Sequence, residues 1–260
     1  MDKKSGAAGL YRVLGRRPVL RVLALGAAIC LLLGVAGLSV GALAESKRRP
    51  IYSVETAEKR VALGINCAWG NEDIEEILAV LERYGVQASF FVLGQWAEKY
   101  PQSVRDIAAA GHEVGSHSNT HADMTTLSEA QIRSQISEST AKIQELTGVR
   151  PTLFRTPSGA YNNQVIALIE DAGLYPIQWD CDSLDYRDLT AEQMWVRISK
   201  NLRPGSILLF HSGTKNTADA LPQIIEQIRA EGYEFTKVSE LIHPRPYTVN
   251  FEGRQRSAAN

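Results

Sequence analysis

The sequence predicts an α/β fold: a distorted barrel of seven or eight β/α units that follows one N-terminal transmembrane helix. Short apolar runs alternate with amphipathic stretches from about residue 60 onward, which is typical of parallel strands covered by helices. No glycine-rich nucleotide-binding turn interrupts this alternation, so the number of units favours a barrel over an open sheet.

The N-terminal segment carries the membrane prediction. No residue from Val22 to Ala44 is charged, and 23 apolar residues can span a bilayer as a helix. Six Lys and Arg side chains precede this run. A basic flank stays in the cytoplasm, so we expect a cytoplasmic segment at 1–18 and a signal anchor at 19–44, with the remainder outside the cell membrane. Ala42-Leu43-Ala44 also resembles a cleavage site, which leaves a cleaved signal peptide as the alternative.

A polar linker is expected at 45–59 and the folded domain at 60–242. Strands are predicted at 61–65, 88–93, 113–116, 153–155, 175–179, 206–210 and 234–238. Helices are predicted at 71–84, 103–110, 128–146, 164–172, 191–201 and 218–230, several of them ended by a glycine. Residues 243–260 are polar and are expected to fray.

Charge and cysteine content narrow the function classes. Residues 1–50 carry nine basic and two acidic side chains, a balance of +7, and the whole chain has a net charge of −1, so residues 51–260 carry −8. This acidic balance argues against nucleic acid as a partner. The three cysteines, Cys30, Cys67 and Cys181, do not make a disulfide framework.

Candidate metal ligands follow a predicted strand. In a barrel, chemistry sits at the carboxyl ends of the strands. His117 and His121 come directly after the strand at 113–116 and stand four residues apart. On a helical turn, that spacing places both rings on one side, where they can share a divalent metal, most simply zinc.

A third histidine, His211, directly follows the apolar strand at 206–210, and its position favours a general acid. Arg155 and Asp185 also follow strands and suit either a structural ion pair or partners that tune neighbouring groups. His112 and His243 have no such placement and are interpreted as surface or packing residues.

These strand ends resemble the motifs of the polysaccharide deacetylase family (NodB homology domain, carbohydrate esterase family 4) over about residues 60–241. His117 to His121 matches the HSxxH motif, and the other motifs match in part. Residues 155–159 (RTPSG) resemble R-P-P-Y-G, Asp185-Tyr186 resembles D-W, and residues 208–211 (LLFH) resemble L-L-x-H. Residues 69–73 (WGNED) resemble the sporulation-associated branch of the family.

The resemblance implies a metal-dependent N-deacetylase that acts on peptidoglycan or a related N-acetylated glycan. In the family, one Asp and two His hold the metal, a second Asp takes a proton from water, and a His protonates the leaving amine. Carried over, His117 and His121 bind the metal and His211 is the acid. By the same resemblance, Asp185 orients His211, Arg155 lies beside the base, and the sugar groove is shaped by Ser158, Tyr186 and Trp69.

The first motif departs from the family pattern. Where the family has T-F-D-D-G, this chain has Gly64-Ile65-Asn66-Cys67-Ala68. Asn66 stands at the position of the base and cannot accept a proton as a carboxylate does. Cys67 stands at the position of the metal aspartate, where it is either a thiolate ligand or an inert buried thiol.

Two functions therefore stay open, of which the first is favoured. One is a deacetylase in which Asp182 or His211 replaces the base. The other is a non-catalytic glycan-binding or scaffold protein of the cell envelope or the developing spore.

Overall fold

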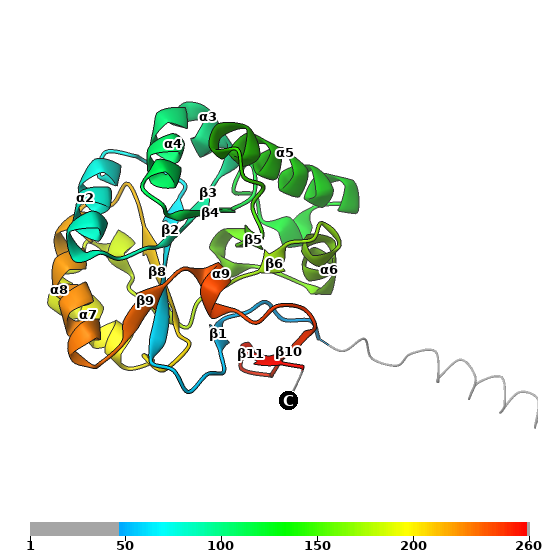
Figure 1. Ribbon diagram of the computed structural model, residues 1–260. Helices are drawn as coiled ribbons and strands as arrows, with labels where there is room; N and C mark the ends of the chain where they lie inside the picture. The colour runs from blue at the N-terminus through cyan, green and yellow to red at the C-terminus, as the bar shows by residue number, and fades with distance from the viewer. Residues whose placement is uncertain (1–46, 259–260) are drawn as a thin grey trace, which may run out of the picture. The chain divides into compact units, whose positions relative to one another are not determined.

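The computed structural model describes residues 47–258, and its central element is a curled parallel sheet surrounded by helices (Figure 1). The hydrogen-bonded strand order is β6-β5-β4-β3-β2-β8-β7, with β9 beside the first residues of β2, and every pair in this sheet is parallel. The predicted alternation of strands and helices is therefore confirmed.

The strands are β1 (Ser53–Val54), β2 (Arg60–Cys67), β3 (Ser89–Val92), β4 (Glu113–Ser116), β5 (Leu153–Phe154), β6 (Tyr175–Pro176), β7 (Cys181–Asp182), β8 (Ile207–His211), β9 (Glu234–Thr236), β10 (Tyr247–Val249) and β11 (Arg254–Ser257). The helices are α2 (Ile74–Tyr84), α3 (Gly94–Lys99), α4 (Pro101–Ala109), α5 (Glu129–Thr147), α6 (Asn163–Asp171), α7 (Ala191–Ser199), α8 (Thr217–Ala230) and α9 (Val238–Leu241).

The sheet does not close strand to strand as a barrel does. Within the described residues, the end strands β6 and β7 do not pair with each other, and a short segment of the predicted linker lies between the sheet edges. The Ile51 amide donates to the carbonyl of Pro176, and Ser53 bridges to Ser206 at the start of β8. Ile51 is fully buried, so the ordered domain begins before residue 60.

The central strand β2 separates two layers of core. Its residues Val61, Leu63, Ile65 and Cys67 pack in one apolar cluster with the helices α2 and α8. Successive side chains of a strand point to opposite faces, so Gly64 and Asn66 face the inside of the curled sheet. This alternation decides which residues of the first motif can reach a pocket.

The C-terminal residues differ from the frayed tail that was predicted. β10 pairs antiparallel with β11, and β11 pairs parallel with β1, which makes a separate three-stranded sheet (Figure 1). Gln255 of β11 is fully buried, and its side chain accepts from the His243 amide and donates to the His243 carbonyl. The tail prediction was wrong because the partner strand lies about two hundred residues earlier in the chain.

Two helix predictions also need correction. The chain at 94–99 forms helix α3, which the sequence did not indicate, and Pro101 begins the next helix, α4. Helix α2 begins after Asp73 rather than Asn71, and Asp73 gives it no side-chain cap. The Asp73 carboxylate instead accepts from the amides of Gly213 and Thr214.

The predicted transmembrane helix at 19–44 lies outside the described residues. In the part of the chain from 47 to 258, none of the helices combines the length and apolar character needed to cross a bilayer.

Candidate active site

A hollow of about 260 Å³ lies at the carboxyl ends of the strands and collects most of the predicted site residues. Its lining is Asn66, Ala68, Trp69, His117, His121, Ser158, Trp179, Asp182, Tyr186, Leu209 and His211. Two further predicted residues, Arg155 and Asp185, are fully buried beneath this lining.

The carboxylate of Asp185 holds His211 in place. Its Oδ1 lies 2.8 Å from His211 Nδ1, and its Oδ2 accepts from the His211 amide at 2.6 Å and from the Thr217 hydroxyl at 2.7 Å. The Tyr186 amide donates to Oδ1 as well. With Nδ1 bound to a carboxylate, Nε2 is the nitrogen that remains for a ligand in the pocket.

His117 and His121 bring their rings together, with centroids 5.1 Å apart. They do so on a loop rather than the expected helical turn, since Ser118 and His121 adopt left-handed φ values of 71° and 62°. His117 Nδ1 lies 2.8 Å from the Arg155 carbonyl, which leaves its Nε2 unengaged. Burial lowers the pKa of His117 to about 3 and also lowers that of His121, so both rings are neutral near pH 7.

Arg155 lies directly beneath Asn66, as the resemblance implied. Its Nη1 donates to Asn66 Oδ1 at 2.9 Å and its Nη2 to the Gln178 carbonyl at 3.2 Å. The guanidinium carbon stands 3.8 Å from the centroid of the Phe91 ring. Among the described residues, no carboxylate lies within ion-pair distance of Arg155, and its Nε lacks a hydrogen-bond partner. The cation is therefore buried without an ion pair, and the Asp182 carboxylate acts on it only from beyond ion-pair distance.

Cys67 does not face the pocket. Its side chain is fully buried in the apolar cluster on the opposite face of β2, and burial raises the pKa of the thiol to about 12. A thiol in this state is protonated, and it is not among the side chains that line the pocket with the two imidazoles. The possibility of Cys67 as a zinc ligand is therefore not supported, and the buried-thiol alternative fits the geometry.

The side chains present do not match the ligand set of one carboxylate and two histidines that the resemblance implies. His117 and His121 provide two imidazoles. Between residues 47 and 258, no three His, Cys, Asp or Glu side chains are grouped so that they could hold a metal ion. A hydrolytic step therefore has neither the expected base nor the expected third ligand from the first motif.

Two exposed aromatic side chains flank His211. The Trp69 ring stacks on the imidazole with centroids 5.0 Å apart, and the Tyr186 ring meets it edge-on at 5.4 Å. Both aromatic residues are almost half exposed. Ser158 lies at the rim with a left-handed φ of 52°, and Asp182 lines the pocket while its Oδ1 accepts from the Leu184 amide.

Sequence reasoning missed three residues that build this site. Asp73 ties the loop after His211 to the loop that carries Trp69, and Thr217 binds the Asp185 carboxylate. Trp179 lines the pocket and lies 5.6 Å from the Arg155 guanidinium. Trp179 had a sequence signal because it ends a predicted strand, and Asp73 had one because it closes the motif at 69–73, whereas Thr217 had none.

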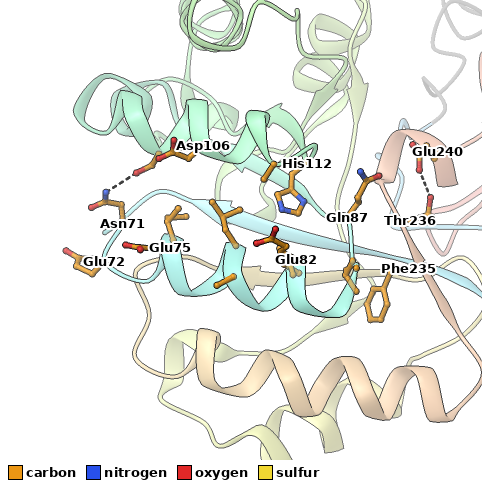
Figure 2. A pocket seen from close by; sticks show the side chains of 18 residues that line it. Asn71, Glu72, Glu75, Glu82, Gln87, Asp106, His112, Phe235, Thr236 and Glu240 are labelled. Carbon is orange, nitrogen blue, oxygen red and sulfur yellow. Dashed lines mark hydrogen bonds between the residues drawn. The ribbon is translucent and has the colours of Figure 1, made fainter.

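A larger groove of about 1000 Å³ lies between α2 and α4 and contains none of the site residues above (Figure 2). Its lining includes five acidic side chains and His112. The Nδ1 of His112 accepts from the Ala88 amide and the ring packs on Phe90, which confirms a packing role. His243 contributes its backbone to the contact with Gln255.

Comparisons with known proteins indicate the same family as the order of the motifs. The family model for polysaccharide deacetylase matches residues 53–177. The uncharacterized protein YlxY of Bacillus subtilis is 34% identical over 193 residues, which are 74% of this chain and 60% of YlxY. The peptidoglycan-N-acetylglucosamine deacetylase PgdA of Listeria monocytogenes is 33% identical over 76% of this chain and 42% of its own length. The chain thus spans less than two thirds of both relatives.

Among solved structures, the CE4 family pseudoenzyme BA3943 of Bacillus anthracis superposes with a TM-score of 0.72 at 34% identity, covering 74% of this chain and 68% of that one. A BA3943 mutant described as having restored enzymatic activity superposes equally well and is covered to 70%. By this fold, the order of its motifs and these similarities, the chain belongs to the polysaccharide deacetylase family.

Proposed function

We propose that this chain binds an N-acetylated glycan of the peptidoglycan type in the pocket above and that it has lost the hydrolytic activity of its family. The observation that carries the proposal is the state of the first motif. Asn66 presents an amide where a base is needed, and Cys67 lies in the apolar core. Loss of a general base alone typically lowers the rate by a factor of ~10²–10⁴.

The remainder of the site supports binding. The exposed Trp69 and Tyr186 rings give apolar faces on which a sugar ring can pack, and His211 and His121 add polar edges. The relatives support the glycan class, since PgdA acts on peptidoglycan N-acetylglucosamine. The similarity to BA3943 supports the loss of activity, because that neighbour is described as a pseudoenzyme.

The test measures both properties on the purified full chain. Acetate release is followed from chitin oligomers and peptidoglycan fragments with added Zn²⁺ or Co²⁺, and glycan binding is followed by calorimetry. The native chain is expected to bind saturably without releasing acetate. An Asn66→Asp variant, which restores a carboxylate at the position that lines the pocket, should gain turnover, and a further His211→Ala change should remove it.

Turnover by the native chain that is lost in His117→Ala would contradict the proposal. Absence of binding to every N-acetylated glycan would contradict it as well.

A second candidate is a deacetylase with a substitute base. It is favoured by Asp182, whose carboxylate lines the same pocket as the three histidines. In that case, the native chain would release acetate, and Asp182→Asn would abolish the release while glycan binding persisted. If His211 instead acted as both the base and the acid, the Asp182→Asn variant would remain active.

We further propose that residues 19–44 anchor the chain in the cell membrane with the folded domain outside. In this position, the protein would act at the cell envelope or the spore. We likewise propose that any metal bound by His117 and His121 is zinc. The full chain should sediment with membranes and resist alkaline extraction, whereas a cleaved signal peptide would leave the mature chain in the supernatant.

A further inference from the structure

The orientation of the Asn66 side chain is fixed by the residue beneath it. A guanidinium carries only donors, so the atom that Asn66 turns toward Arg155 must be its carbonyl oxygen, Oδ1. Nδ2, the other end of the amide, then points away from Arg155. Within residues 47–258, the Asn66 side chain makes no other hydrogen bond, and the residue lines the pocket.

Arg155 cannot turn to accommodate a different arrangement. Its guanidinium is fully buried against the Phe91 ring. It also fills the space above Gly64, where an added Cβ would lie 2.6 Å from Nη2. The carboxamide of Asn66 therefore stands on a rigid donor and presents its own N–H groups to whatever occupies the pocket.

This arrangement reverses the hydrogen-bonding polarity of the pocket floor. A carboxylate at position 66 would offer only acceptors to a ligand, whereas the amide offers donors. The acetamido group of a sugar has a carbonyl oxygen that accepts from such donors. A deacetylated sugar has an ammonium group near neutral pH, which has donors only and carries the same charge as the buried Arg155.

Asp182 opposes this preference for the acetylated sugar. It is the one carboxylate in the pocket lining, and it would attract an ammonium group. Its Oδ1 already accepts from the Leu184 amide at 2.9 Å, so only part of its acceptor capacity faces the pocket. Removing the charge of Asp182 should therefore increase the preference for acetylated sugar that Asn66 creates.

We propose that Asn66, held by Arg155, makes this pocket a reader of the acetylation state: it accepts N-acetylated sugars and rejects the deacetylated ones. The inference rests on the proposed glycan binding and goes beyond it, because it assigns the selectivity to one amide. Asn66 acts here as a specificity-determining residue.

The experiment compares two probes on the full chain, the tetramer of N-acetylglucosamine and the tetramer of glucosamine. Affinities are measured by calorimetry with a chelator present, so that no metal-dependent turnover consumes the first probe. The native chain should prefer the acetylated tetramer by about tenfold or more, as expected for one buried hydrogen bond and an unfavourable charge contact. Asn66→Asp and Asn66→Leu should each reduce this ratio, and Asp182→Asn should increase it.

Asn250→Asp serves as the matched control. Asn250 uses its Oδ1 to accept from the Glu252 and Arg254 amides in the β10–β11 turn, which a carboxylate can also do. This variant should keep the native ratio. Equal affinity of the native chain for both tetramers, or an unchanged ratio in Asn66→Asp, would overturn the inference while glycan binding stood. Binding of neither tetramer would overturn the proposed function itself.

Discussion

At the scale of single residues, the pair of Asn66 and Arg155 is the most consequential feature. A cation in the interior that forms no ion pair is costly, because its desolvation is offset only in part by the charge of Asp182 beyond ion-pair distance. Burial accordingly lowers the pKa of Arg155 to about 9. The amide of Asn66 relieves this cost only in part, since it contributes a dipole rather than a charge.

Asn66→Asp should therefore stabilise the fold at pH 7, even though it adds a second buried ionised group. We expect the free energy of unfolding to rise by about 1–3 kcal/mol, because the new carboxylate would pair with Arg155. Urea denaturation at pH 7 measures this change. Asn250→Asp should leave stability within about 0.5 kcal/mol. A loss of stability in Asn66→Asp would show that desolvation of the carboxylate outweighs the pairing.

His112 gives a second prediction at the same scale. Burial lowers its pKa to about 4 in the folded state, whereas an unfolded histidine titrates near ~6.5. Between these values, the unfolded chain binds the proton and the folded chain does not, so stability falls as the pH drops from 6.5 to 4. The contribution is at most about 3 kcal/mol.

His112→Asn keeps an acceptor for the Ala88 amide and removes the titration. Denaturation curves at pH 7 and pH 4.5 should show a smaller loss of stability in this variant than in the native chain. The same loss in both proteins would mean that other groups cause the acid sensitivity.

At the scale of elements, the alternation along β2 decides more than the motif letters do. Position 66 points inward and position 67 outward, so two adjacent substitutions have separate consequences: one alters the pocket floor, and the other extends the apolar core. The sequence could place both residues at a strand end. It could not tell which face each would take, because the predicted strand ended at Ile65 and left both residues in the following loop, whereas β2 continues to Cys67.

Local signals predicted the long helix α5 well. Ser128 caps it through the Gln131 amide, with the reciprocal bond from Gln131 present, and Gly148 ends it in a left-handed conformation. Ser128→Ala should lower the free energy of unfolding by about 1 kcal/mol. Ser137→Ala, at an exposed position inside the helix, should have little effect. Equal effects of both changes would contradict the capping role of Ser128.

At the scale of the whole molecule, the succession of strands and helices along the chain and most of the pocket residues could be predicted, because each β/α unit has its own local pattern. The features that could not be predicted depend on contacts between segments that are distant in the sequence. β1 and β11 stabilise each other across about two hundred residues, and each is too short and too polar to be recognised alone. The open sheet edge has the same cause, since residue 51 reaches it from outside the repeating units.

A chain ending at Ile242 should therefore be less stable than the full chain. It loses β10 and β11 and leaves the Glu55 amide without the Gln255 carbonyl. We expect a loss of at least about 2 kcal/mol in the free energy of unfolding. A chain ending at residue 258 is the control and should match the full chain. Unchanged stability in the shorter chain would show that the small sheet contributes nothing.

The small sheet also determines how the domain can be approached. β1 lies against residues 205–206, directly before β8, and the last residue of β8 is His211 in the pocket. The path of the chain into the domain and its path out through β11 are thus side by side, at the far end of β8 from the pocket. Among the described residues, the lining of the pocket accordingly includes none from β1, β10 or β11, so the small sheet leaves the mouth of the pocket uncovered.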